Sequence, residues 1–288
     1  FLMKDGTVGW NPGKNNPNIV RPLGTIDPEV RSVYFEGSDG KPLGAYVNFA
    51  NHLDTVGGTE FSADYPYTIA NVLANAKGDD FLTVFTIGTA GQINHVDVSS
   101  PVPQKGHQEA ARIGTVLAGS VVESWRRLEP VAGPVQARTV TLDLDTGTME
   151  ADAPEKARKL LEGYGEQPNA PFLDLVRAFR ALDLERAKGK MKAEVQVITL
   201  GRDLAWVGLP GEVFVELGKT LKIRSPFRHT LVAEMANGRA GGYIPDRKAY
   251  DQGAYEVVSS RLAPGSGEAL VDAAVGMLIE LHRTAPAR

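Results

Sequence analysis

Two chemically capable side chains each follow an apolar run of the sequence, where a strand would end. His52 comes just after the run that ends at Ala50, in a loop that also contains Asp54 and Asp64. Glu212 follows a second apolar run and the turn Gly-Leu-Pro-Gly. A strand-end histidine combined with a distant glutamate is the usual composition of a catalytic zinc site with an open position for water. These two residues are therefore candidate metal ligands.

Both residues also have simpler interpretations. An isolated histidine such as His52 is commonly a hydrogen-bonded surface or core residue. A carboxylate at a strand-to-helix corner, as we expect for Glu212, can cap the first turn of a helix, where unpaired N–H groups favour negative charge. A glycine-rich turn ending in Tyr243 follows about 30 residues later, and Tyr255 and Glu256 come after it. Strand ends that carry Glu and Tyr can converge on one pocket.

A third group of polar residues follows the apolar run that ends at Ile87. It contains Asn94, His95 and Asp97. We interpret His95, with Asp97 nearby, as a second metal ligand, a general base or an oriented hydrogen-bonding residue. Ser62 is the serine close to His52 in sequence, and its Ser-x-Asp-Tyr-Pro context favours a turn over a nucleophile.

The elements that must position these residues form an α/β pattern without a strict βαβ rhythm. The segment 1–27 is rich in Gly, Pro and Asn, which predicts an ordered loop. Apolar alternation and helical periodicity predict the remaining elements. The expected strands are 30–35, 43–50, 81–87, 135–144, 193–199, 204–207 and 230–233, and the expected helices are 67–76, 108–128, 152–162, 172–188 and 268–282. The sequence thus predicts a mixed central sheet flanked by helices.

Composition restricts the class of protein. The 288 residues are 42% hydrophobic and 23% charged, with a formal net charge of −4, which is ordinary for a globular domain and argues against nucleic acid as a partner. No apolar run approaches the ~20 residues of a transmembrane helix. There are no cysteines, so thiolate metal sites and a cysteine nucleophile are excluded. Motifs for phosphate loops, dinucleotide folds and serine-hydrolase elbows are absent as well.

Four stretches together resemble a known family. VNFANHLDTVGG with FSADYP, FTIGTAGQINHVDV, LPGEVFVELG and ANGRAGGYIPDRKAYDQGAYE occur in the order found in the catalytic domain of the neutral/alkaline, non-lysosomal ceramidase superfamily. The resemblance extends from about Val8 to Leu281. It is strongest to bacterial ceramidase-like proteins of unassigned substrate.

The resemblance implies a Zn²⁺ cofactor held by two histidines, a glutamate and a tyrosine. Carried over, the zinc ligands are His52, Glu212 and Tyr243, while Tyr255 would polarise the substrate carbonyl. The family's other zinc histidine lies in a motif upstream of Phe1. The family's serine falls on Asn94, so His95, or Asp97 through a water, would manage the proton.

These implications give one main functional hypothesis and two alternatives. The main hypothesis is a zinc-dependent hydrolase of amide bonds, with an N-acyl substrate that is ceramide-like or another lipid-like or small acylated compound. The first alternative is a non-catalytic protein that binds lipid or glycan on the same scaffold. The second is a metal-independent ester hydrolase using Ser62 with His95.

The organisation of the chain is expected to be simple. We expect residues 1–288 to form one ceramidase-like hydrolase domain, with a helical insertion at 145–190. Because the sequence begins at Phe1 in a turn-rich segment, we expect an N-terminal part, with any signal peptide, to be missing. We expect a secreted or periplasmic location rather than a cytoplasmic one, and the sequence carries no signal for the oligomeric state.

Overall fold

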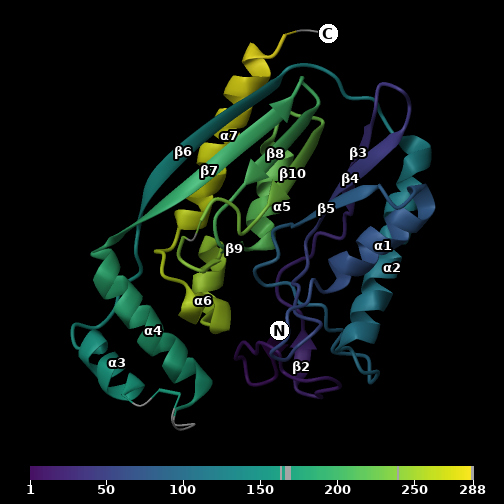
Figure 1. Ribbon diagram of the computed structural model, residues 1–288. Helices are drawn as coiled ribbons and strands as arrows, with labels where there is room; N and C mark the ends of the chain where they lie inside the picture. Colours follow the sequence, from purple (N-terminus) through teal and green to yellow (C-terminus); the bar gives the residue numbers. More distant parts are fainter. Residues whose placement is uncertain (163, 166–169, 239, 287–288) are drawn as a thin grey trace.

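A three-stranded sheet with two helices on one face forms the first half of the fold. The structure is a computed structural model that describes residues 1–162, 164–165, 170–238 and 240–286 (Figure 1). In the order β3-β4-β5, β3 is antiparallel to β4 and β4 is parallel to β5. Inward-facing residues such as Val47 pack against Ile69 and Leu117 of the helices, which gives this half its own core. The elements are β3 (Arg31–Glu36), β4 (Pro42–Phe49), β5 (Leu82–Ile87), α1 (Tyr65–Lys77), α2 (His107–Ser124) and a 3-10 turn (Trp125–Arg127).

A four-stranded sheet forms the second half, in the order β10-β8-β7-β6. Strands β6, β7 and β8 are antiparallel neighbours, whereas β8 and β10 are parallel. Helices α5 and α7 cover one face (Figure 1), and the apolar stripe of α7, including the fully buried Leu278, closes the second core. The elements are β6 (Val135–Asp145), β7 (Lys190–Leu200), β8 (Leu204–Gly208), β10 (His229–Ala233), α5 (Val215–Arg224) and α7 (Ser266–Thr284).

The two sheets meet where β4 lies beside β10. Asn48 is buried in β4, and its side-chain amide donates to the carbonyl of Val232 at 3.0 Å and to that of Thr86 at 3.2 Å. The backbone N–H of Glu234, just after β10, donates to the carbonyl of Ile87 at the end of β5. A polar residue in an otherwise apolar strand therefore joins the halves, and the carboxyl ends of β4, β5 and β10 meet at one edge.

Shorter strands and helices complete the fold. Helices α3 and α4 come between β6 and β7 in the sequence, and they pack on each other away from the sheets (Figure 1). Residues 163 and 166–169 in this segment are outside the described part. Two short two-stranded ladders, β1-β2 and β9-β11, complete the strands. The bounds are β1 (Leu2–Met3), β2 (Ile19–Arg21), α3 (Ala153–Leu161), α4 (Phe172–Ala187), β9 (Glu212–Val213), β11 (Tyr243–Ile244), a 3-10 helix (Arg247–Gln252) and α6 (Tyr255–Ser259).

The predicted mixed α/β fold is confirmed, and each expected long strand and helix is present within a few residues of its expected bounds. The segment 1–27 contains the β1-β2 ladder and an isolated bridge between Leu2 and Val8 and is otherwise irregular, as its Gly, Pro and Asn content predicts. Within the described ranges, no helix has both the length and the apolar character needed to cross a bilayer.

Candidate active site at the meeting edge of the two sheets

The candidate site lies beyond the carboxyl ends of strands from both halves, which is the usual position of ligand sites in α/β sheets. His52 follows β4, whereas Glu212 follows β8 and lies in β9. The two residues are 160 positions apart, yet His52 Nε2 lies 3.2 Å from Glu212 Oε2. The fold therefore brings together the two residues that the sequence identified separately.

A hydrogen bond to a backbone carbonyl fixes the orientation of the His52 ring. Its Nδ1–H donates to the carbonyl of Ile93 at 2.9 Å, and its backbone N–H donates to the same carbonyl. Because a carbonyl can only accept, this bond fixes the proton on Nδ1 and turns Nε2 toward Glu212. Metal-binding imidazoles are commonly oriented by such a bond.

Glu212 is held by the turn that precedes it. Gly211 has φ of 72°, and a Cβ there would lie 2.4 Å from the carbonyl oxygen of Gly242, so this position requires glycine. The N–H of Glu212 donates to the same carbonyl. Helix α5 begins only at Val215, so the interpretation of Glu212 as a first-turn cap is wrong; the first-turn acid of α5 is Glu216.

Tyr243 lies beside Glu212 because β11 is parallel to β9, with Tyr243 opposite Glu212 in the register. Residues opposite each other in a parallel pair project to the same face. The Tyr243 hydroxyl lies 3.5 Å from His52 Nε2, and the two rings stack with centroids 6.3 Å apart. His52, Glu212 and Tyr243 thus converge, and we call them the His-Glu-Tyr trio.

The charges of the site shift its pKa values. Burial lowers the pKa of His52, but the hydrogen bond to Glu212 and the charges of Glu234, Glu212 and Asp54 outweigh burial and raise it to about 9. Burial and the charge of Glu212 raise the pKa of Tyr243 well above its usual value. In the metal-free chain at neutral pH, His52 is therefore a cation and Tyr243 a neutral phenol.

Tyr255 begins α6 and lies next to the trio. The centroid of its ring lies 5.6 Å from that of Tyr243, and the Trp10 ring stacks on it with centroids 4.6 Å apart. Phe172 of α4 extends this aromatic cluster, 5.5 Å from Tyr255. Burial and the charges of Glu212 and Glu256 raise the pKa of Tyr255, so its hydroxyl stays protonated and can donate a hydrogen bond.

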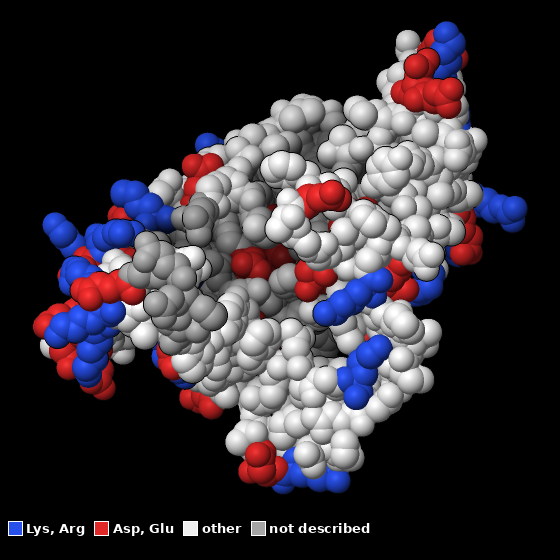
Figure 2. All heavy atoms as spheres, turned by 60° about the horizontal axis from the view of Figure 1, so that its bottom comes forward, with Lys and Arg blue, Asp and Glu red and all other residues white. Residues whose placement is uncertain are grey.

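The site opens on a large cavity of about 1860 Å³. The N-terminal segment and α5 both contribute to its walls, and the trio residues His52 and Tyr243 lie in its lining with Tyr255 and Glu256. Figure 2 shows that this face of the molecule is hollowed, with Asp and Glu side chains deep in the hollow and Lys and Arg side chains near its margin. Much of the remaining lining is apolar: Val8, Trp10, Leu23, Ile26, Phe214, Leu217, Ile223, Val257 and Val271.

Of the three roles predicted for His95, its contacts fit the oriented hydrogen-bonding residue and do not fit the base or the metal ligand. Its Nδ1 lies 2.8 Å from Asp54 Oδ1, and its Nε2 lies 2.8 Å from the carbonyl oxygen of Gln104. Both partners are acceptors, so the geometry favours the imidazolium, and the bond to Asp54 raises the pKa of His95. No ring nitrogen remains free to take a proton or bind a metal.

Asn94 and Asp97 also have local structural roles. Asn94 lines the cavity, donates to Asp54 Oδ2 at 3.2 Å and accepts from the N–H of Val96. Asp97 accepts from the N–H and hydroxyl of Ser99, which lowers its pKa, and it does not line the cavity. The predicted participation of Asp97 in proton transfer is therefore unsupported by its position.

Ser62 makes the turn that its sequence context predicts. Its hydroxyl accepts from the N–H of Asp64, the residue that caps α1. No contact joins Ser62 to His95 among the described residues, whose hydrogen bonds use other partners. The described residues therefore lack the Ser62–His95 arrangement that the alternative of a metal-independent ester hydrolase requires.

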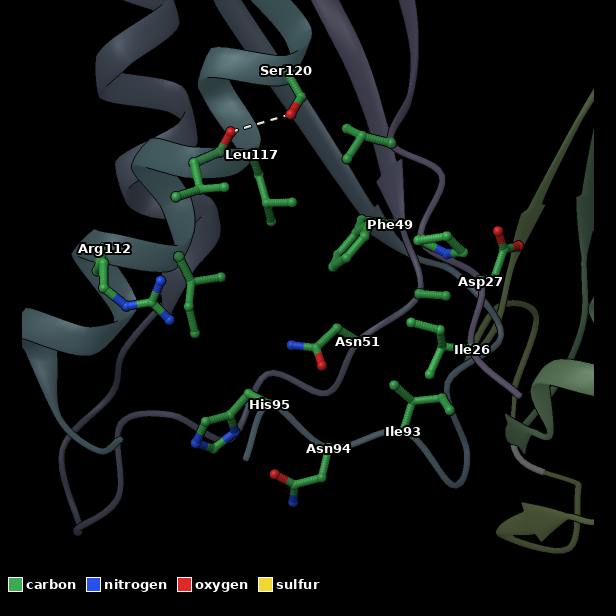
Figure 3. Close-up of a pocket in the computed structure, with 15 residues that line it drawn as sticks. Ile26, Asp27, Phe49, Asn51, Ile93, Asn94, His95, Arg112, Leu117 and Ser120 are labelled. Carbon is green, nitrogen blue, oxygen red and sulfur yellow. Dashed lines mark hydrogen bonds between the residues drawn. The ribbon is translucent and has the colours of Figure 1, made fainter. Parts of the chain in front are cut away.

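A smaller pocket of about 430 Å³ lies behind the loop that carries Ile93 and His95. Figure 3 shows its labelled side chains, with Leu117 and Arg112 on α2 facing Phe49 and the loop residues. Arg112 is paired with Glu109 and the Ser120 hydroxyl donates to the carbonyl of Val116, so these polar groups are satisfied. This pocket is separate from the trio.

The trio offers donors that zinc accepts, an imidazole nitrogen and a carboxylate oxygen, together with a phenol. The described residues contain no group of three or more His, Cys, Asp or Glu side chains that could hold a metal ion. The trio contributes two such residues and a tyrosine. The orientation of His52 by the Ile93 carbonyl fits a metal ligand, so the donor set is compatible with three of the ligands of a zinc site.

One acidic residue near the trio escaped the sequence analysis. Glu234 directly follows β10 and is only 3% exposed. Glu212 was identified because it is a carboxylate that follows an apolar run. Glu234 carries the same signal, because it follows the apolar run 230–233. Trp10 gave no comparable signal, because an aromatic residue in an irregular segment has no periodic context.

The fold and site define a mixed α/β protein with a polar site at the joint edge of two sheets. Two solved structures share this architecture. The structure of neutral ceramidase from Pseudomonas aeruginosa matches with a TM-score of 0.66 and 17% identity over 91% of this chain and 48% of that chain. A ceramidase complexed with C2 matches with a TM-score of 0.68 and 17% identity over 91% of this chain and 49% of that chain.

These matches confirm a ceramidase-like fold. No family model matches the sequence, and no curated protein matches it. The chain spans about half the length of the two similar structures. At this level of identity the similarity shows the fold alone, and function has to be argued from the site.

Proposed function

We propose that the chain is a hydrolase of amide bonds in N-acyl compounds, with zinc as its cofactor. The observation that carries this proposal is the convergence of His52, Glu212 and Tyr243 beside Tyr255 at a large cavity. The ceramidase-like fold supports it, because both similar structures are ceramidases.

His52, Glu212 and Tyr243 would hold the metal. When bound, zinc supplies a Lewis acid that activates water near neutral pH and polarises a carbonyl. The carbonyl of Ile93 keeps the His52 ring in one orientation. Because His52 has a pKa of about 9 in the metal-free chain, metal binding must displace a proton from it, which makes zinc affinity increase with pH.

Two further side chains would act on the substrate. The protonated Tyr255 hydroxyl would donate to the carbonyl oxygen as negative charge develops there. Burial raises the pKa of the neighbouring Glu256, so this carboxyl keeps its proton at higher pH than an ordinary glutamate. In this proposal Glu256, rather than His95, delivers the proton to the leaving amine.

The cavity indicates the kind of substrate. Its volume of about 1860 Å³ exceeds what a small metabolite needs, and its apolar residues lie on both the N-terminal wall and α5. A long acyl chain would be stabilised along such a surface by burial of its methylene groups, at ~0.8 kcal/mol each. We therefore propose lipid-like N-acyl amines as the substrate class.

The test is hydrolysis of a series of N-acyl amines of increasing chain length by the zinc-supplemented protein, with release of the fatty acid measured by mass spectrometry. We expect activity that rises with chain length and is lost with a chelator. Tyr255→Phe should reduce kcat about 100-fold with little effect on zinc content. Tyr67→Phe, on the exposed surface of α1, is the matched control and should be fully active.

The same experiment distinguishes the alternative of a binding protein. Binding of N-acyl amines without any cleavage by the zinc-loaded chain would reject the hydrolase and support the non-catalytic alternative. Cleavage that is unaffected by the chelator would reject the metal-dependent mechanism.

A further inference from the structure

Glu234 is a buried carboxyl group that the proposed chemistry does not use. It follows β10 and lies close enough to His52 for its charge to raise the pKa of that histidine. Burial raises the pKa of Glu234 itself to about 8. A buried acid of this kind costs stability, so its presence calls for a role beyond packing.

One oxygen of Glu234 binds two backbone segments. Oε2 accepts from the N–H of Val213 at 2.7 Å and from the N–H of Ala90 at 3.1 Å. The other oxygen, Oε1, has no hydrogen-bond partner among the described atoms. The carboxyl group thus uses one oxygen to join β9 to the loop after β5, and the adjacent Gly91 N–H donates to the Val213 carbonyl to close the same connection.

This connection matters because β9 is only two residues long. On one side β9 pairs with β11, which carries Tyr243. On its other side no strand is paired with β9 in the described sheets, and the carboxyl group of Glu234 and the N–H of Gly91 occupy the place of a strand neighbour. These bonds therefore join the ladder that carries two members of the trio to the half that carries His52.

We propose that Glu234 is a positioning residue that fixes Glu212 and Tyr243 against His52 by binding the N–H groups of Val213 and Ala90. The inference rests on the proposed metal site for its functional meaning. Its physical content, the hydrogen bonds through Oε2, can be tested without metal.

Two substitutions separate the length of the Glu234 side chain from its ionisable carboxyl group. Glu234→Gln keeps the length and an acceptor oxygen but replaces the ionisable carboxyl group with a neutral amide. Glu234→Asp keeps the carboxyl group but shortens the side chain by one bond, about 1.5 Å, which is enough to break both hydrogen bonds. Glu109→Asp is the matched control, because Glu109 is another buried glutamate whose partner, Arg112, is on α2.

Hydrogen–deuterium exchange of the metal-free protein measures the positioning directly. We expect Glu234→Asp to accelerate exchange at the amides of Val213 and Ala90 at least tenfold, and Glu234→Gln to leave it within about threefold of wild type. In chelator competition, we expect Glu234→Asp to weaken zinc binding about tenfold, the magnitude typical of residues that orient metal ligands, and Glu234→Gln and Glu109→Asp to retain affinity.

Unchanged exchange in Glu234→Asp would overturn the inference, and so would equal acceleration in Glu234→Gln, which would assign the effect to loss of the carboxyl group rather than to its reach. If the wild type binds no zinc, the proposed function fails. The exchange result then still decides whether Glu234 positions β9.

Discussion

The contact between His52 and Glu212 predicts how the stability of the metal-free chain depends on pH. The pKa of His52 is about 9 in the folded chain and 6.5 without its neighbours. At ~1.4 kcal/mol for each pKa unit, this difference corresponds to about 3 kcal/mol of stability. Because the folded pKa is raised, this stability is fully present below pH 6.5 and is lost as the pH rises toward 9.

Glu212→Gln removes the charge that faces His52 and keeps the shape. The test is the free energy of unfolding of wild type and Glu212→Gln, determined by urea denaturation in the presence of a chelator at pH 6 and at pH 9.5. The stability advantage of wild type over Glu212→Gln should be larger at pH 6 than at pH 9.5, by up to about 3 kcal/mol. Both side chains are less than a third exposed, at 22% and 25%, so solvent screening leaves most of this effect.

Glu129→Gln is the control for this measurement. It removes the partner of His229, but that pair is 38% and 47% exposed and should contribute little at either pH. A wild-type advantage that is equal at pH 6 and pH 9.5 would refute the contact between His52 and Glu212. A larger advantage at pH 9.5 would refute the sign of the linkage.

Three substitutions test the packing that supports the site. A Cβ on Gly91 would lie 2.5 Å from the Glu212 carbonyl oxygen, so Gly91→Ala should cost about 1–3 kcal/mol of unfolding free energy and weaken zinc binding. The Tyr65 hydroxyl donates to the Asn51 carbonyl beside His52, so Tyr65→Phe should cost about 1–3 kcal/mol. Leu278 of α7 is fully buried in the second core, so Leu278→Ala should lower the free energy of unfolding by about 2–5 kcal/mol and leave the zinc affinity of the folded fraction unchanged. Urea denaturation and chelator competition check each variant, and wild-type values for all three would contradict the packing described.

Local patterns predicted the long elements well, because each has a strong apolar period. The β3-β4 hairpin and the terminal helix α7 follow directly from alternation and from helical spacing. The pairing of β4 with β10 through Asn48 could not be predicted, because it depends on a contact across 184 residues.

The site was partly predictable for the same reason. Strand-end position alone identified His52 and Glu212, but the cap interpretation of Glu212 failed because backbone bonds to Gly242 delay the start of α5. His95 shared the strand-end signal, yet its partner is Asp54, 41 residues away, rather than the adjacent Asp97. Which strand-end polar residues meet, and which make local turns, is decided by tertiary contacts that sequence spacing does not encode.

Metal content tests the central claim most directly. Mass spectrometry of the intact protein after zinc loading and dialysis, with His52→Ala and Glu212→Ala beside wild type and His229→Ala as control, measures whether the trio binds a metal. We predict about one zinc ion per chain in wild type and in the control, and loss of the ion in both site variants. Zinc retained by both site variants, or absent from the loaded wild type, would contradict the account.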